Sequence, residues 1–265
     1  MFIQKLFRHK LFLAFIFFLV SSAVTAQPQP YTAANAHSHN DYEQATPFWL
    51  AWKAGFGSIE ADIFLEGDEL LVAHDTAALK KRHALEKLYL QPLDSCIRTN
   101  NGYVYPGKRP LILLVDIKTE AVATLNKLVA VLQHYPALIH SPSLLITISG
   151  NRPDPATYTN WPGWIYFDGE LVKTYPAEAY ARIPMVSGNF KTFSKWTGIN
   201  TLPPADSTIL ENTIRQWHSL GKRTRFWNAP DTPNSWKTLV ALGADFINTD
   251  HIPELSEFFQ RQSAK

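Results

Sequence analysis

The side chains best suited to chemistry lie within one short stretch of the chain. His37 and His39 come first, Glu60 and Asp62 follow, and His74 closes the stretch. Because Glu60 and Asp62 are two residues apart, both carboxylates would leave the same face of a strand. Such a pair can bind a hard cation such as Mg²⁺ or Ca²⁺, which prefers oxygen ligands. With a histidine on either side as general base and general acid, the stretch predicts metal-assisted chemistry on a phosphate ester.

A third carboxylate ends the most apolar run of the chain, LILLVDIK over residues 111–118. Asp116 and Lys118 at the end of a buried strand must be paired or must face a cavity, because burying a lone charge is costly. They are either a structural ion pair or functional groups. In the functional interpretation, Asp116 is a third ligand of the cation and Lys118 contacts phosphate oxygens.

Two further interpretations of these side chains are open. His37 and His39 share one face of a strand and could bind zinc, but zinc would need a third nitrogen or sulfur ligand. The chain has one cysteine, Cys96, and its remaining histidines stand in helical or turn contexts. Trp227, at the end of a later apolar run, is either a core residue or a substrate-facing wall.

The elements that must position these residues repeat in a regular order. Segments with helical periodicity over residues 47–55, 121–134, 208–220 and 236–242 separate most of the predicted strands. A repeated strand–helix order indicates a parallel sheet, and eight such units fit a (β/α)₈ TIM barrel. An open doubly wound sheet is the alternative, but no Gly-rich phosphate loop follows the first strand. The eight strands begin near residues 33, 58, 111, 144, 164, 183, 223 and 245, the first covering 32–39.

The region after the second strand departs from this order. Gly67 and Asp68 predict a turn into a short strand over residues 70–74, and a charged helix is predicted over 79–90. In a TIM barrel, active groups lie at the C-terminal ends of the strands. The unusual polar residues of this sequence follow that rule, among them His37, His39, Glu60, Asp62, Asp116, Lys118, Asp168, Asn189, Trp227 and Asp250.

The N-terminus has the pattern of a secretory signal peptide. Basic residues at positions 5, 8 and 10 precede an apolar run over residues 11–20, and small residues lead to Ala26. We therefore expect an exported protein that is cleaved after Ala26. The alternative is an uncleaved membrane anchor, although the apolar run is short for a span of about 20 residues.

The rest of the chain is predicted to form one globular domain. Its 46% hydrophobic content indicates a well-buried core. Residues 27–32 form a short polar lead, and we assign 33–265 to a single TIM-barrel domain. Removal of residues 1–26 would change the formal charge from +2 to −1, because three basic and no acidic residues are lost. That charge balance excludes the basic surface that nucleic-acid binding requires. We also expect the protein to be a monomer.

The order of these motifs resembles the phosphatidylinositol-phospholipase-C-like phosphodiesterase superfamily, in its glycerophosphodiester phosphodiesterase and sphingomyelinase D branches. Those families carry a histidine after the first strand, Glu-x-Asp, a second histidine, an acid-x-Lys and a late tryptophan. The closing residues 243–250 are similar to the Gly-x-Asp…Thr-Asp ending of the glycerophosphodiesterases. The matching residues here are His37 or His39, Glu60, Asp62, His74, Asp116, Lys118 and Trp227.

The first motif departs from the glycerophosphodiesterase pattern. Ser38 and His39 stand where those enzymes have Arg and Gly, and Asp116 stands where they usually have Glu. His37 and Asn40 fit a His-x-x-Asn pattern of the sphingomyelinase D branch. The resemblance therefore favours His37 as the catalytic histidine, with His39 orienting it or lining the pocket.

The resemblance implies a phosphodiester hydrolase, or a cyclising phosphodiesterase, acting on glycerophosphodiesters or phospholipid headgroups with transient contact to a membrane surface. One alternative is an exported barrel that binds a phospholipid headgroup or glycan without catalysis. Another is a glycoside hydrolase that uses two carboxylates, which would leave the histidines without a role. The implied roles are proton transfer by His37 and His74, one Mg²⁺ or Ca²⁺ on Glu60, Asp62 and Asp116, and substrate binding by Lys118, Asn40 and Trp227.

Overall fold

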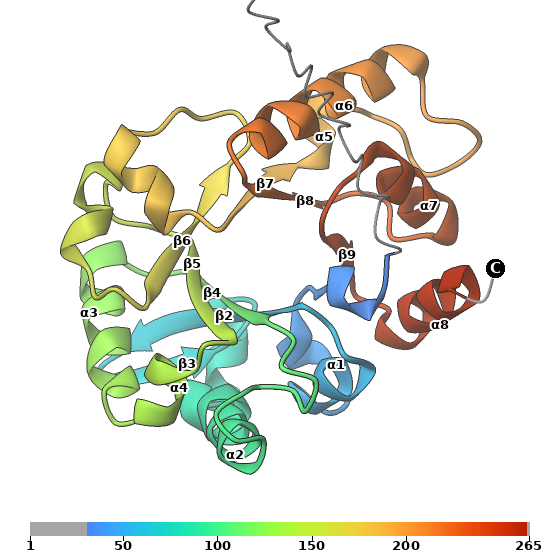
Figure 1. The fold of residues 1–265 in the computed structure, drawn as a ribbon. Coiled ribbons are helices and arrows are strands. Elements are labelled where there is room, and N and C mark those ends of the chain that lie inside the picture. The colour runs from blue at the N-terminus through green and yellow to red at the C-terminus, as the bar shows by residue number, and fades with distance from the viewer. Residues whose placement is uncertain (1–30, 264–265) are drawn as a thin grey trace, which may run out of the picture.

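The computed structural model describes residues 31–263, and the predicted signal peptide over 1–26 lies outside the described residues. Eight parallel strands form a ring that is surrounded by helices (Figure 1). A ninth strand, β3 (Glu69–Val72), pairs with β2 as an antiparallel hairpin. The parallel strands are β1 (Ala36–Ser38), β2 (Ser58–Glu66), β4 (Leu111–Ile117), β5 (Leu144–Gly150), β6 (Ile165–Glu170), β7 (Met185–Asn189), β8 (Arg223–Trp227) and β9 (Ile247–Thr249).

The ring of strands closes into a barrel. The neighbouring strands run in the order β8-β7-β6-β5-β4-β2-β1-β9. A parallel bridge between Arg225 and Phe246 joins the two ends of this order, next to a hydrogen bond from the Phe246 amide to the Thr224 carbonyl. The predicted (β/α)₈ TIM barrel is therefore confirmed.

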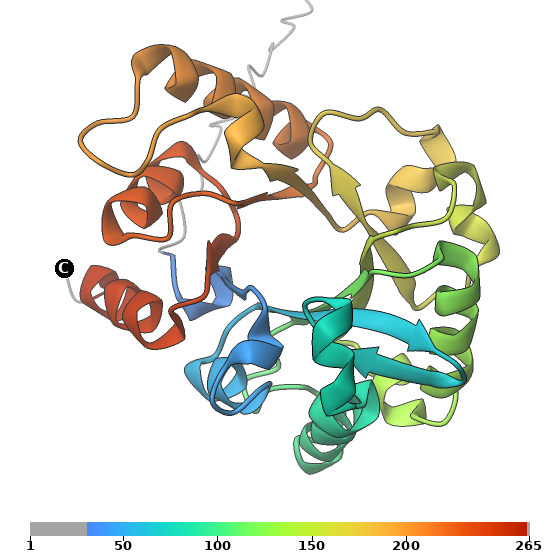
Figure 2. The ribbon, with the colours of Figure 1, turned by 180° about the vertical axis from the view of Figure 1, so that it is seen from behind.

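Helices cover the outside of the barrel on all sides, as the two opposite views show (Figures 1 and 2). The last helix, α8, lies beside α1 and so brings the two ends of the domain together. Within residues 31–263, none of the helices combines the length and the hydropathy needed to cross a bilayer. The helices are α1 (Trp49–Ala54), α2 (Gln91–Thr99), α3 (Ala121–Leu132), α4 (Pro136–His140), α5 (Phe190–Phe193), α6 (Pro204–Ser219), α7 (Pro233–Leu242) and α8 (Ile252–Ser263).

The alternation of side chains on β4 divides the core into two parts. Leu111, Leu113 and Val115 pack with the surrounding helices in the large outer core. Ile112 and Leu114 instead join Met185 and Phe246 in a separate cluster. Since residues two apart share one face of a strand, Asp116 continues the face of Ile112 and Leu114. The carboxylate end of this face therefore lies directly beyond an apolar cluster.

Two predicted elements differ from the structure. The predicted first strand over residues 32–39 begins with a 3-10 turn (Ala33–Asn35), because the Thr32 side chain accepts from the Ala34 amide and caps that turn. The predicted helix over residues 79–90 is wrong as one element. A 3-10 helix (Thr76–Lys81) ends at Arg82, whose φ of 47° is left-handed, and a π-helical turn (Glu86–Leu90) then leads into α2.

Candidate active site

A cavity of about 470 Å³ opens at the C-terminal ends of the barrel strands. This is the end at which TIM barrels carry their active groups. It has an acidic side on β2 and β4, and its lining around β6 to β8 combines apolar side chains with charged ones such as Arg152 and Glu170. The lining includes His39, Asn40, Glu60, Asp62, His74, Asp116, Lys118, Asp168, Val172, Arg225 and Trp227.

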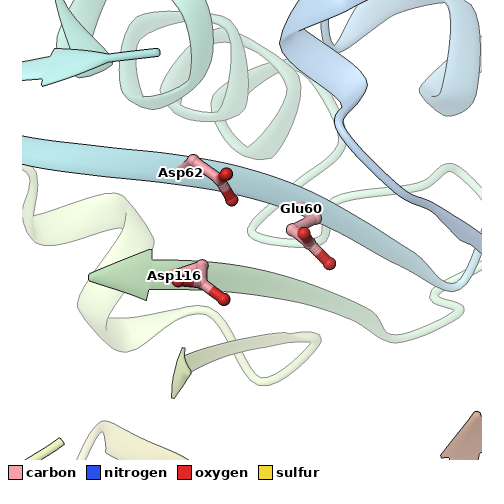
Figure 3. Close-up of side chains that lie close together, drawn as sticks. All are labelled: Glu60, Asp62 and Asp116. Atoms are coloured by element: carbon pink, nitrogen blue, oxygen red, sulfur yellow. The ribbon is translucent and has the colours of Figure 1, made fainter. Parts of the chain in front are cut away.

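Three carboxylates converge on one spot of this cavity (Figure 3). Glu60 and Asp62 lie two residues apart on β2, and Asp116 faces Asp62 directly in the register of β2 and β4. One oxygen of each carboxylate lies within 4.8 Å of the others. The structure thus brings together the three side chains that the sequence nominated as cation ligands.

The geometry of the three carboxylates fits a divalent cation. Asp62 Oδ1 is buried and has no hydrogen-bond partner among the described residues, which is costly unless a cation satisfies it. Gly150 makes room for Asp116, because a Cβ at this glycine would lie 2.2 Å from Asp116 Oδ1. Oxygen ligands from three acidic side chains are typical of Mg²⁺ and Ca²⁺ sites.

Lys118 partly neutralises this cluster. Its ammonium lies 2.9 Å from Asp62 Oδ2 and 3.0 Å from Asp116 Oδ1. Burial and the charge of Glu60 raise the pKa of Asp62 to about 6, against the opposing effect of Lys118. Burial also raises the pKa of Asp116, and Lys118 again opposes the shift. Additional positive charge would therefore stabilise both carboxylates in their ionised form.

Arg225, which the sequence did not nominate, reaches the acidic side from β8. Its guanidinium donates to Glu60 Oε2 at 2.7 Å and to Ser187 Oγ at 3.0 Å. It also contacts His37 Nε2. Burial alone would raise the pKa of Glu60, but the charge of Arg225 and the hydrogen bond to His37 lower it. Glu60 is therefore held as a carboxylate.

The two histidines of the first motif occupy different environments. His37 is fully buried, with Nδ1 2.8 Å from Ser58 Oγ and Nε2 2.8 Å from Glu60 Oε2. Burial and the charge of Arg225 lower the pKa of His37 to about 3, so its ring is neutral. His39 is partly exposed and lines the cavity. Of the two histidines, it is His39 that faces the space where a substrate would bind.

His39 lies between two acidic side chains. Its Nδ1 is 2.8 Å from Asp250 Oδ1, and its Nε2 is 3.9 Å from Glu60 Oε1. Burial lowers the pKa of His39, but the hydrogen bond to Asp250 and the charge of Glu60 outweigh burial and raise it. A histidine with a raised pKa beside a polar cavity is suited to proton transfer.

His74 lies at the opposite end of the carboxylate pair. Its Nδ1 is 3.9 Å from Asp62 Oδ2 and 3.3 Å from the Tyr42 hydroxyl. The same hydroxyl lies 2.8 Å from both Asp62 Oδ2 and Asn40 Oδ1. Tyr42, which the sequence did not nominate as a site residue, therefore links His74 to the acidic cluster.

The remaining polar residues of the first motif hold the loop in shape. Asp41 is fully buried and accepts hydrogen bonds from Ser38 Oγ at 2.7 Å, the Phe48 amide at 2.6 Å and the Tyr89 hydroxyl at 2.9 Å. Burial raises the pKa of Asp41 and these three donors oppose the shift. Asp41 thus fixes the loop that carries His39 and Asn40.

The lining of the cavity around β6 to β8 includes exposed apolar side chains. Trp227, at the end of β8, is 39% exposed, and Val172 beyond β6 is 71% exposed. Below them Asp168 is buried and accepts from Ser187 Oγ at 2.9 Å and Ser149 Oγ at 3.2 Å. Burial raises the pKa of Asp168 to about 6 in spite of nearby arginines. Trp227 therefore lies where a substrate-facing wall was predicted.

Two family models match parts of the chain. Residues 28–138 match an AIM6-like phosphodiesterase domain. Residues 223–253 match the glycerophosphoryl diester phosphodiesterase family. The first match contains both cavity histidines and the three carboxylates, and the second contains Arg225, Trp227 and Asp250.

Curated relatives come from fungi. The altered inheritance of mitochondria protein 6 homolog of Arthroderma benhamiae is 26% identical, over 84% of this chain and 83% of its own length. Altered inheritance of mitochondria protein 6 of Eremothecium gossypii is 27% identical, over 84% of this chain and 68% of its own. The protein of the same name from Saccharomyces cerevisiae is 23% identical, over 88% of this chain and 73% of its own length.

A solved structure has the same fold. It is the crystal structure of a glycerophosphodiester phosphodiesterase from Parabacteroides distasonis, with a TM-score of 0.54. The match covers 87% of this chain and 98% of that one, at 13% sequence identity. At this identity the likeness establishes the fold alone.

The names of the fungal relatives correct one expectation. They refer to the inheritance of mitochondria in those fungi, which does not support an exported protein. The prediction of an exported protein is therefore wrong. The reason is that a few basic residues before a short apolar run do not by themselves determine the compartment that a chain reaches.

Proposed function

Because this chain belongs to the glycerophosphodiester phosphodiesterase-like superfamily of TIM barrels, we propose that it is a divalent-cation-dependent phosphodiester hydrolase. One observation carries the proposal. Two solvent-accessible imidazoles, His39 and His74, line the same cavity as the three carboxylates, and each lies 3.9 Å from a carboxylate oxygen of β2. This arrangement has an acid and a base on opposite sides of a cation site, as hydrolysis of a phosphodiester requires.

In this proposal His39 and His74 move the protons. One takes a proton from the attacking group, which is water or a neighbouring hydroxyl of the substrate, and the other gives a proton to the leaving alkoxide. Attack by a neighbouring hydroxyl would give a cyclic phosphate as the first product. His37 has a structural role, because its ring is buried and both of its nitrogens have partners.

Glu60, Asp62 and Asp116 would hold the cation. When bound, a divalent cation neutralises charge that develops on the phosphate oxygens in the transition state. Lys118 adds a second positive group on the same side of the cavity, and its ammonium is within reach of a phosphate near Asp62 and Asp116. The acidic side of the cavity thus binds the phosphate end of the substrate.

The other side of the cavity receives the alcohol part of the substrate. Trp227 offers an exposed aromatic face, and Val172 extends the apolar rim. Asn40 lies next to His74 through their shared partner Tyr42 and can contact the substrate from the acidic side. We therefore expect a small phosphodiester that has a polar phosphate end and a partly apolar alcohol.

A panel of phosphodiesters tests this proposal. Glycerophosphocholine, a lysophospholipid, sphingomyelin and phosphatidylinositol are each incubated with the protein, with and without a chelator, and products are identified by phosphorus NMR. We expect turnover of at least one substrate, loss of turnover with chelator, and loss of turnover in His74→Gln and Glu60→Gln. Turnover that survives the chelator, or full activity in either variant, would overturn the proposal.

A further inference from the structure

Tyr42 holds one oxygen of Asp62, a member of the carboxylate cluster. It lies in a 3-10 turn (Asp41–Glu43), and its ring packs in the outer core. Its hydroxyl lies 2.8 Å from Asp62 Oδ2. A tyrosine hydroxyl donates one hydrogen, and an ionised carboxylate makes a stronger hydrogen bond than a neutral acceptor. Tyr42 therefore donates its hydrogen to Asp62.

The two oxygens of Asp62 have different environments. Lys118 Nζ lies 2.9 Å from Oδ2, so this oxygen has a second donor besides Tyr42. Asp62 Oδ1 is buried and has no hydrogen-bond partner among residues 31–263. A carboxylate that has one oxygen held by two donors can offer only its other oxygen to a cation. Asp62 is thus positioned as a ligand through Oδ1 alone.

The other two carboxylates of the cluster share this pattern. Arg225 donates to Glu60 Oε2 at 2.7 Å, and His37 Nε2 lies 2.8 Å from the same oxygen. Lys118 Nζ lies 3.0 Å from Asp116 Oδ1. Each of the three acidic side chains therefore has one oxygen engaged by the protein. Binding of a cation through both oxygens of any of them would compete with that partner.

The number of free oxygens distinguishes between Mg²⁺ and Ca²⁺. Ca²⁺ takes six to eight oxygen ligands in flexible geometry, and carboxylates often bind it through both oxygens. Mg²⁺ is smaller, requires a nearly regular octahedron, and keeps several waters or phosphate oxygens beside a few carboxylate oxygens. A site that offers one oxygen from each of three carboxylates therefore favours Mg²⁺.

We propose that Tyr42 is a positioning residue that keeps Asp62 a single-oxygen ligand and so makes the cluster select Mg²⁺ over Ca²⁺. This inference rests on the cation site of the proposed function. It does not rest on turnover, because cation binding is measured without a substrate. A chain that binds Mg²⁺ more tightly than Ca²⁺ but hydrolyses no phosphodiester would contradict the proposed function and support the selection.

Isothermal titration calorimetry of metal-free protein with MgCl₂ and with CaCl₂ tests the selection. We expect the wild type to bind Mg²⁺ more tightly than Ca²⁺. Tyr42→Phe changes no charge but removes one donor from Asp62 Oδ2. It should weaken Mg²⁺ binding about 10–100-fold, the usual effect of losing a group that orients a ligand, and leave Ca²⁺ binding within about threefold. Equal losses for both cations, unchanged binding of both, or a wild type that binds neither cation or prefers Ca²⁺ would overturn the proposal.

Tyr105 provides a matched control outside the cavity. It is buried, and its hydroxyl donates to the Phe56 carbonyl at 2.6 Å. Tyr105→Phe therefore removes a buried tyrosine hydroxyl without touching the carboxylates. Its affinities for both cations should equal those of the wild type, and a loss as large as that of Tyr42→Phe would overturn the specific role of Tyr42.

A second variant tests the same oxygen from its other partner. Lys118→Met removes the ammonium that contacts Asp62 Oδ2 and Asp116 Oδ1. Loss of a positive charge should strengthen the binding of both cations, but the freed oxygens should favour Ca²⁺ more. The ratio of Ca²⁺ to Mg²⁺ affinity should therefore rise, as in Tyr42→Phe. An unchanged ratio would overturn the proposal even if Tyr42→Phe fails to fold.

Discussion

Arg225 and Glu60 form an ion pair across the interior of the barrel, with 2.7 Å between Arg225 Nη1 and Glu60 Oε2. Both side chains are almost completely buried, and they come from β8 and β2, which are not neighbours in the sheet. The pair leaves Glu60 Oε1 directed toward His39. One oxygen of Glu60 is thus held by the protein while the other remains available in the cavity.

Loss of Arg225 should destabilise the barrel. Arg225→Met leaves Glu60 buried without its main countercharge, and removing one partner of a buried pair costs about 3–5 kcal/mol. The free energy of unfolding in urea measures the loss. Arg215→Met, an exposed arginine on α6, serves as the control and should change stability by less than about 0.5 kcal/mol. Equal effects of the two substitutions would contradict a structural role for the ion pair.

Divalent cations should stabilise the folded chain through the three carboxylates. A ligand at one hundred times its Kd stabilises the native state by about 2.7 kcal/mol. Thermal unfolding should therefore shift upward with Mg²⁺ or Ca²⁺ and return to its starting value with chelator. Asp116→Asn should abolish the shift. Asp168→Asn removes a buried carboxylate outside the cluster, and this variant should still show the upward shift in thermal unfolding. An equal response to the cation in both variants would argue against the assigned ligands.

Asp168 should make the stability of the protein depend on pH. Burial raises its folded pKa from 3.8 to about 6, so the folded state binds this proton more tightly than the unfolded state. The contribution of Asp168 to the free energy of unfolding is therefore greatest below pH 3.8. This contribution falls as the pH rises from 3.8 to about 6 and is constant above that pH, and the total decrease is up to about 3 kcal/mol.

Asp168→Asn, which mimics the neutral carboxyl, should therefore gain stability relative to the wild type over that pH range. Unfolding free energies of both proteins at a series of pH values from 3.5 to 8 measure the gain. A difference between them that does not vary with pH would contradict the raised pKa.

The acidic cluster was predictable from sequence because its geometry follows from local periodicity. Residues two apart on a strand share a face, which places Glu60 and Asp62 together. The end of the most apolar run identifies Asp116 as a strand-end carboxylate. The neighbouring strands β2 and β4 then place Asp116 beside this pair, since Asp62 pairs with Asp116 and Glu60 with Leu114.

The roles of Arg225 and of the two histidines were not predictable in this way. Arg225 contacts Glu60 over a separation of 165 residues, and no local pattern distinguishes it from an ordinary strand residue. His37 and His39 share a face by periodicity, but His37 pairs with Ser58 and so lies deeper in the barrel than Glu60. That depth depends on the stagger between β1 and β2, which the sequence does not reveal.

Substitution of the two histidines should separate their roles. His39→Gln should lower kcat by about 10²–10⁴-fold, the usual contribution of a general acid or base, and leave unfolding in urea nearly unchanged because its ring is partly exposed. His37→Gln should keep most of the activity but lose about 1–3 kcal/mol of stability, because buried hydrogen bonds to Ser58 and Glu60 are broken. The reverse result, with turnover abolished by His37→Gln in a protein of wild-type stability, would assign proton transfer to His37 instead.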